Sequence, residues 1–315
     1  MMIQISVIAA SFFKEQMSNP EELIAQANKI ANKSGGFLSS IFGGSSTSKY
    51  EEAADLYVQA ANLYKLQRRS AEAGEIFEKA SELQIKAENN DEASNTLIES
   101  FKCYKMESPE RAAKVLERAI GMFVQRGQFR RSANFKCDLG EIYENELQDI
   151  NNAIKSYEDA SEWYKGDSAT ALSNKCLLKV ADLYCDDNIK NYKKAATIYE
   201  EIAKKSLNNN LAKWSLKEYF LKAILCRLAD ENDYSSANAV LMRFLQWDPS
   251  FASTKEYEFS SKLIEAVKDC NPDQIAIESK NFDKFSRLDG MKVRILNTIK
   301  SNLNVAPDTV EEDFT

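Results

Sequence analysis

The residue types that most often carry out enzyme chemistry are absent from this sequence or lack the necessary spacing. Histidine does not occur among the 315 residues, which excludes Ser-His-Asp triads and histidine-dependent zinc sites. The sequence also lacks a phosphate-binding loop, a GxGxxG motif after a strand and an HExxH motif. Carboxylates are numerous but form no recognisable catalytic constellation. We therefore predict that the chain is not an enzyme and binds no metal or cofactor.

The six cysteines could bind metal or form disulfides, but their spacing favours neither role. No pair has the CxxC spacing of metal and redox sites, and all six fall in segments with a helical pattern. We interpret them as reduced core thiols of a cytosolic protein, with metal binding or disulfide formation as the alternative. They are Cys103, Cys137, Cys176, Cys185, Cys226 and Cys270.

An apolar loop is predicted over residues 35–46. It places Phe37, Leu38, Ile41 and Phe42 among glycines and serines, where burial is hard to arrange. Exposed apolar tips of this kind insert into membranes. The alternative is a loop folded onto its own first helix.

The end of the chain is a short acidic peptide with one apolar anchor. Glu311, Glu312 and Asp313 precede Phe314, and residues 301–315 contain no basic residue. We expect this tail to be mobile until it is bound, because such peptides suit basic grooves. The alternative is a tail that only aids solubility.

The first 16 residues contain an apolar stretch but do not resemble a signal peptide. No basic region precedes the stretch from Ile3 to Phe13, and charged and polar residues follow it where a cleavage site would need small ones. The stretch is also too short to span a bilayer. Because Met17-Ser-Asn-Pro resembles a second translation start, we interpret residues 1–16 as an N-terminal extension that need not be translated.

Long helices must position these segments. Only 10 glycines and 5 prolines leave little turn material for sheet hairpins, and 44% hydrophobic residues suffice for a large core. The net charge of −7 argues against nonspecific nucleic-acid binding. The composition therefore favours an all-α fold without a nucleic-acid partner.

Small residues recur with a period of 20, which predicts stacked helical hairpins. Each unit fits one amphipathic helix plus a turn, and two units make a hairpin of the tetratricopeptide-like type. Breakers in every unit argue against the alternative of a continuous coiled coil. The first series is Ala53, Ala73, Ala93, Ala113, Ala133, Ala153 and Ser173, continued by Ala195; the second is Ala60, Ala80, Ser100, Ile120, Gly140, Ala160 and Val180.

After Leu207 the period fades and longer helical patterns follow. They predict helices over 214–229, 234–246, 253–269, 274–285 and 291–303. We interpret residues 17–207 as a tetratricopeptide-like solenoid, 208–300 as a C-terminal helical bundle that caps it, and 301–315 as an acidic tail.

Several ordered strings resemble the soluble NSF attachment protein (alpha-SNAP) family, most closely its fungal vesicular-transport form. The resemblance covers residues 17–315, and the set is specific although each string alone is weak. The strings begin at Met17 (MSNPEEL), Gly36 (GFLSSIFG), Tyr50 (YEEAADLY), Arg126 (RGQFRRSANF), Ala171 (ALSNKC), Trp214 (WSLKEYFLK), Ser286 (SRLD) and Glu311 (EEDFT).

The resemblance implies an adaptor in vesicle fusion and intracellular transport. Several copies would surround a four-helix SNARE bundle, and their C-terminal ends would dock an NSF-type hexameric AAA+ ATPase that pulls the bundle apart. The adaptor would lie on the cytosolic faces of secretory, endosomal and vacuolar membranes, with the apolar loop touching the membrane surface. A generic tetratricopeptide-like peptide-binding scaffold is the alternative, and it would need neither the loop nor the tail.

Basic residues in the middle of the chain are the candidate SNARE grip. A concave basic stripe would bind acidic SNARE surfaces with salt-sensitive affinity, whereas a solvated helix face is the usual place for lysine and arginine. The family's SNARE-contact lysines fall on Lys175, Lys179 and Lys217, but another such position aligns with Asn134. The whole candidate set is Arg126, Arg130, Arg131, Lys136, Lys175, Lys179 and Lys217.

The candidate ATPase-binding residues lie near the C-terminus. In the family the acidic end docks the ATPase and stimulates its hydrolysis, with a leucine where Phe314 stands here. Acidic residues of the bundle assist: Glu265 and Asp269 match them, whereas Lys268 departs. The set is Glu265, Asp269, Glu311, Glu312, Asp313 and Phe314.

Overall fold

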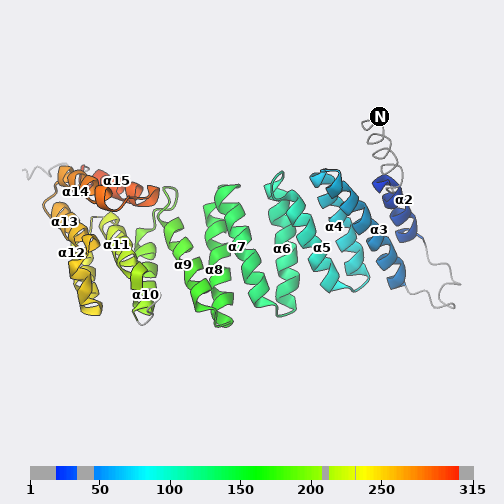
Figure 1. Cartoon of the computed structure of the whole chain (residues 1–315), viewed down its shortest axis with the longest axis horizontal. Helices are drawn as coiled ribbons and strands as arrows, with labels where there is room; N and C mark the ends of the chain where they lie inside the picture. The colour runs from blue at the N-terminus through cyan, green and yellow to red at the C-terminus, as the bar shows by residue number, and fades with distance from the viewer. Residues whose placement is uncertain (1–18, 34–45, 208–212, 231, 305–315) are drawn as a thin grey trace, which may run out of the picture. The chain divides into compact units, whose positions relative to one another are not determined.

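The computed structural model describes residues 19–33, 46–207, 213–230 and 232–304. This part of the chain contains 14 α-helices, one 3-10 helix and no strand (Figure 1), which confirms the all-α fold of tetratricopeptide-like hairpins. The helices are α2 (Pro20–Ala31), α3 (Ser46–Leu66), α4 (Ser70–Lys86), α5 (Asn90–Tyr104), α6 (Pro109–Gln125), α7 (Phe129–Asn145), α8 (Ile150–Gly166), α9 (Thr170–Tyr184), α10 (Tyr192–Ser206), α11 (Lys213–Ala229), α12 (Tyr234–Trp247), η1 (Pro249–Ser253), α13 (Lys255–Lys268), α14 (Pro272–Phe285) and α15 (Gly290–Asn304).

The chain divides into two compact units, Met1–Ser156 and Tyr157–Thr315, and the division falls within α8. In the second unit, one continuous core of buried residues extends from Ala181 in α9 to Ile299 in α15. Helices α9 and α10 therefore share a core with the helices that follow residue 207. The domain limits placed at 207 and 300 from the sequence stay predictions.

The two series of small residues lie where helices pack together. Small side chains let neighbouring backbones approach closely, and larger residues such as Phe77 and Leu97 fill the space between them. The prediction that these series form the contact faces is confirmed, because every member is buried. Those with no exposed surface at all include Ala53, Ala73, Ala93, Ala133, Ala153, Ala60, Ala80, Ser100, Ala160 and Val180.

Most turns between the helices close through a residue in the left-handed conformation. Arg68, Glu88, Gly127 and Ser168 have φ between 58° and 70°, at spacings of about 20 or 40 residues. After each, the next N–H returns to a carbonyl five residues back; the Arg69 N–H, for example, donates to the Tyr64 carbonyl at 2.9 Å. This Schellman closure satisfies the last carbonyls of each helix. Only Gly127 among these four is glycine, so the turns at 68 and 88 lack the usual glycine signal.

A tyrosine–glutamate hydrogen bond joins the two helices of three successive hairpins. Burial raises the pKa of the tyrosines, and the carboxylate partner raises it further, to about 12 for Tyr143, so each phenol stays protonated and donates at neutral pH. In every case the partners are 26 positions apart. The bonds join Tyr104 to Glu78 at 2.9 Å, Tyr143 to Glu117 at 3.0 Å and Tyr184 to Glu158 at 3.1 Å.

Gly74 in α4 provides the space that the Tyr104 ring occupies. A Cβ atom at position 74 would lie 2.6 Å from a carbon of that ring. We expect Gly74→Ala to lower the free energy of unfolding by about 1–3 kcal/mol, because overpacking outweighs the better helix propensity of alanine. The matched control is Gly121→Ala in α6, where no atom of the described residues lies within 4 Å of the new Cβ. Urea unfolding measures both, and a Gly74→Ala protein as stable as this control would contradict the expectation.

The helix predicted over 253–269 begins later than expected. Residues Pro249–Ser253 form the 3-10 helix η1, and α13 starts at Lys255. Thr254 separates the two because its extended backbone and its hydroxyl, which accepts from the Tyr257 N–H at 3.1 Å, cap α13. The other predicted C-terminal helices match the observed ones to within two residues.

Candidate functional site

Lys175 and Lys179 lie one turn apart on α9, as the sequence predicts. Lys175 is exposed and makes no ion pair or hydrogen bond within the described ranges. Lys179 is half-buried and has a partner. Between them Cys176 turns into the core, which fixes the outward face of the helix. Lys175 is therefore the candidate cation that is most available to a binding partner.

Arg126 and Arg131 bind the first turns of α5. Arg126, at the end of α6, forms an ion pair with Asp91. Arg131 in α7 donates to Asn95 Oδ1 at 2.7 Å, and its guanidinium carbon lies 4.1 Å from the centroid of the Phe123 ring. Both arginines thus connect α7 and the preceding turn to α5, a role that the sequence did not reveal.

The remaining residues of this group differ in exposure. Arg130 is exposed and Lys136 is half-buried. Each of them interacts with another residue of the protein. Asn134, at the position where the family has a lysine, is exposed on the same helix. The basic residues of α7 are therefore already engaged within the fold.

Lys217 in α11 neutralises a buried carboxylate. Its Nζ lies 2.8 Å from Oε1 of Glu256, whose side chain is only 6% exposed, while the lysine side chain is 43% exposed. The second carboxylate oxygen of Glu256 is buried and has no hydrogen-bond partner in the described part of the chain. Because Lys217 is the only described cation that contacts this buried carboxyl group, it has a structural role in the second unit.

Glu265 and Asp269 are exposed at one end of the α13–α14 hairpin. Together with Glu258 and Lys262 they follow helical spacing along one side of α13. Asp269 caps the helix, and Cys270 beside it adopts a left-handed conformation with φ of 51°. The structure thus brings the two predicted acidic residues of the bundle together on one edge.

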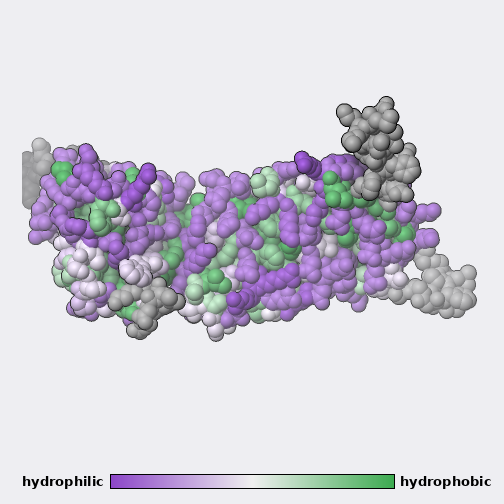
Figure 2. Space-filling model, viewed as in Figure 1, coloured by the Kyte–Doolittle hydropathy of each residue, from purple (hydrophilic) through white to green (hydrophobic). Residues whose placement is uncertain are grey.

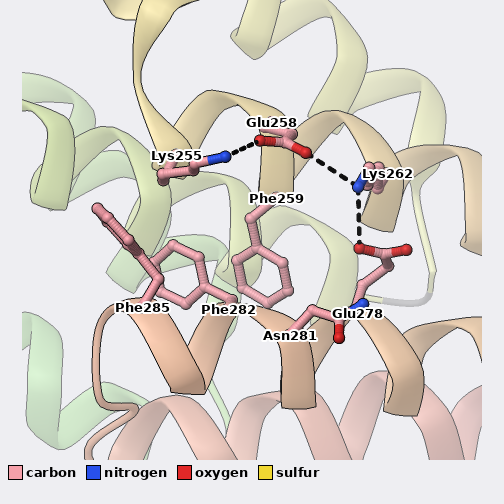
Figure 3. Close-up of a pocket in the computed structure, with 8 residues that line it drawn as sticks. All are labelled: Lys255, Glu258, Phe259, Lys262, Glu278, Asn281, Phe282 and Phe285. Atoms are coloured by element: carbon pink, nitrogen blue, oxygen red, sulfur yellow. Dashed lines mark hydrogen bonds and ion pairs between the residues drawn. The ribbon is translucent and has the colours of Figure 1, made fainter.

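A groove of about 120 Å³ lies between α13 and α14, and the sequence did not predict it. Phe259 and Phe282 stack with ring centroids 4.4 Å apart at its base, and Phe285 stands at one end, 64% exposed (Figure 3). The signal in the sequence is the pair of phenylalanines three residues apart, both at the end of α14.

A row of ion pairs forms the rim of this groove (Figure 3). Lys255 contacts Glu258 at 2.8 Å, and Lys262 bridges Glu258 at 3.0 Å and Glu278 at 3.3 Å. The bonds to Glu258 and Glu278 raise the pKa of Lys262, and Lys255 and Lys262 lower that of Glu258. Glu258 and Lys262 therefore stay ionised at neutral pH.

The apolar loop and the acidic tail lie outside the described residues. This applies to Phe37, Leu38, Ile41 and Phe42, and to Glu311, Glu312, Asp313 and Phe314. The face drawn in Figure 2 is mostly hydrophilic. Among the described helices, none combines the length and the apolar character needed to cross a membrane.

The prediction that all six cysteines are core thiols is partly wrong. Cys103, Cys176, Cys185 and Cys226 are buried, Cys137 is half-buried and none of the six forms a disulfide in the structure, but Cys270 is exposed. Cys270 occupies the turn after α13, where a left-handed backbone points its side chain to solvent. Cys185 and Cys226 have their sulfur atoms 3.5 Å apart in the core, and burial raises the pKa of the Cys226 thiol. No group of three or more metal-ligating side chains occurs in the ranges that the structure describes.

These features define an all-α repeat protein that offers cationic and acidic surfaces and a shallow groove. The family model of the soluble NSF attachment proteins matches residues 18–304. The chain is 56% identical over 299 residues to the vesicular-fusion protein SEC17 of Komagataella phaffii, covering 95% of this chain and 100% of that protein. It is 46% identical to the alpha-soluble NSF attachment protein of Saccharomyces cerevisiae (93% and 99% covered) and 34% identical to that of Mus musculus (89% and 93% covered). The chain belongs to the soluble NSF attachment protein family.

Proposed function

We propose that this protein is an adaptor that binds SNARE complexes and recruits and stimulates an NSF-type AAA+ ATPase for SNARE disassembly. The observation that carries the proposal is the full-length match to relatives that are named vesicular-fusion and NSF attachment proteins. The protein would act in vesicle fusion and transport, at the cytosolic faces of secretory, endosomal and vacuolar membranes.

The exposed side of α9 is the part of the grip that the contacts support best. Lys175 presents a charge that no described residue neutralises, with Lys179 one turn further on. An ammonium group held on a rigid helix favours acidic surfaces of many sequences and loses affinity as salt rises. Arg126, Arg131 and Lys217 would contribute less, because their charges already satisfy Asp91, Asn95 and Glu256.

The C-terminal edge of the bundle supports docking of the ATPase. Glu265 and Asp269 place exposed negative charge beside the α13–α14 turn. The tail adds Glu311, Glu312 and Asp313 before the apolar Phe314. Together they would suit a basic surface with an apolar recess on the motor.

A reconstituted pull-down tests the proposal. Immobilised SNARE complex should retain the ATPase only when this protein is present, and the complex should come apart when ATP and magnesium are added. Phe314→Ser should retain SNARE binding but lose ATPase recruitment, because one buried aromatic anchor often dominates a peptide interface. A generic peptide-binding scaffold would show neither ATPase recruitment nor disassembly, and that result would reject the proposal.

We also expect the loop at residues 35–46 to contact membranes. Replacing Phe37 and Leu38 by Ser should weaken binding to liposomes at least tenfold, because each large apolar side chain contributes about 1.5–3 kcal/mol when buried. Binding to SNARE complexes in solution should not change. Co-sedimentation with liposomes measures the effect.

A matched control for the loop replaces exposed apolar residues elsewhere. Leu66 is 71% exposed and Met106 is 88% exposed, both outside the loop. The Leu66→Ser, Met106→Ser protein should bind liposomes as the wild type does. If the loop variant bound equally well, the membrane contact would be rejected.

A further inference from the structure

The α13–α14 groove described above has the features of a site for one apolar side chain. Its base is the stacked pair Phe259 and Phe282, and its volume is about 120 Å³, comparable to one aromatic ring. Phe285 leaves 64% of its surface uncovered at the open end. A large apolar side chain exposed beside a preformed apolar hollow favours association with another apolar group.

The charge near the groove is divided between its two ends. At the end away from the turn, Lys284 and Arg287 are exposed and have no ion pair among the described residues, and Lys255 lies close to Phe285 on the rim. At the turn end, Glu265 and Asp269 are exposed, with exposed Lys268 next to Asp269. Asp283 offsets part of the positive charge at the Phe285 end, but the excess there is basic, so an acidic peptide with an apolar residue is favoured at that end over the other.

The chain itself contains a peptide of this composition within reach. Helix α15 packs against α14 and ends at Asn304, so 11 residues follow it. Eleven extended residues span up to about 36 Å, and they include four acidic residues, no basic residue and a single aromatic, Phe314. We propose that in the free protein this C-terminal segment folds back and places Phe314 in the α13–α14 groove, with its acidic residues toward Lys284 and Arg287.

Docking within one chain needs only modest affinity. A short tether holds the tail near its site at a millimolar effective concentration, so a weak contact is well occupied. The consequence is a masked tail: a partner that binds Phe314 must first displace it from the groove. The inference does not depend on what that partner is, and its test uses neither SNAREs nor ATPase, so it can fail while the proposed function stands.

Digestion by carboxypeptidase Y measures whether the tail is docked. The full-length protein is mixed with a synthetic peptide of residues 301–315, and the loss of Thr315 and Phe314 from each is followed by mass spectrometry. We expect the protein to be trimmed about tenfold more slowly than the peptide, because only the undocked fraction is cleaved. Equal rates would overturn the inference.

Two substitutions in α14 test whether protection of the tail from carboxypeptidase requires the groove. Phe285→Ser should raise the trimming rate to that of the peptide, whereas the control Ile277→Ser, a residue 51% exposed on another side of the same helix, should keep the tail protected. Because both residues are exposed, both variants should fold, and circular dichroism checks this. Protection that survives Phe285→Ser, or that falls when the protein is diluted and so depends on a second copy, would contradict the proposal.

Discussion

Replacing Lys217 by methionine is expected to lower the free energy of unfolding of the C-terminal unit by about 3 kcal/mol. The change keeps the aliphatic stem but removes the only cation among the described residues that contacts buried Glu256. The carboxylate would then be buried with one oxygen already unpaired and the other newly so. Leaving a buried charge without its partner is among the most costly single changes in a protein.

Tryptophan fluorescence during urea unfolding measures this effect selectively. The three tryptophans of the chain, Trp163, Trp214 and Trp247, all lie in the C-terminal unit. Adding Glu256→Gln to the Lys217→Met protein should recover most of the loss, because the uncompensated charge is then removed. This recovery distinguishes electrostatics from lost packing.

Lys65 offers a matched control for Lys217. Its side chain is 40% exposed, close to the 43% of Lys217, but its partner Glu99 is 36% exposed instead of 6%. Lys65→Met should therefore cost at most about 1 kcal/mol. Equal losses for Lys65→Met and Lys217→Met would show that burial of the carboxylate is not the cause. If the Lys217→Met protein stays folded but no longer binds SNARE complexes, Lys217 would instead belong to the SNARE-binding surface.

Reversing the charge of Lys175 and Lys179 together should lower the affinity for SNARE complexes about tenfold for each ion pair that is lost. Each exposed ion pair contributes up to about 1 kcal/mol, and reversal replaces attraction by repulsion. Because several copies would act on one bundle, the loss of overall avidity should exceed the loss for a single copy. A binding titration at physiological salt measures it, and the gap between wild type and variant should narrow as salt rises.

Two further variants distinguish a loss of binding at α9 from a folding defect and from a change in net charge. Lys179 is half-buried with a partner, so its reversal can also affect folding, whereas Lys175→Glu alone removes only an exposed, unpaired charge. Lys280→Glu, Lys284→Glu changes the net charge equally with the same four-residue spacing on α14. Undiminished binding of the Lys175→Glu protein, or an equal loss in the α14 variant, would show that α9 does not form the grip.

The helical architecture could be predicted from sequence because its cause is local. A period of 20 in small residues requires one close helix contact per unit, and Ala53, Ala73 and Ala93 are indeed fully buried. Glycine and proline are the clearest turn signals in a sequence, as at Gly127 and Pro109. The turn at Arg68 contains neither residue, because a Schellman closure depends on backbone hydrogen bonds that a non-glycine residue also permits.

The candidate site was harder to predict, because whether a charged side chain is paired depends on residues that are far away in the sequence. Lys217 meets a carboxylate 39 positions away, and Arg131 binds Asn95, 36 positions away. Nothing in the local sequence around these residues distinguishes them from Lys175, which has no described partner. The position of the groove beside Phe285 depended likewise on how α13 and α14 pack.

The regular tyrosine–glutamate bonds have a mechanical consequence. Each one joins the last turn of the second helix to the middle of the first helix, so a force that slides one helix along the other loads this bond and the apolar contact at the same time. Elements loaded in parallel share the tension, whereas elements loaded in series fail one after another. Because the bond recurs at the same place in three hairpins, the same sliding force should meet a similar resistance in each of them.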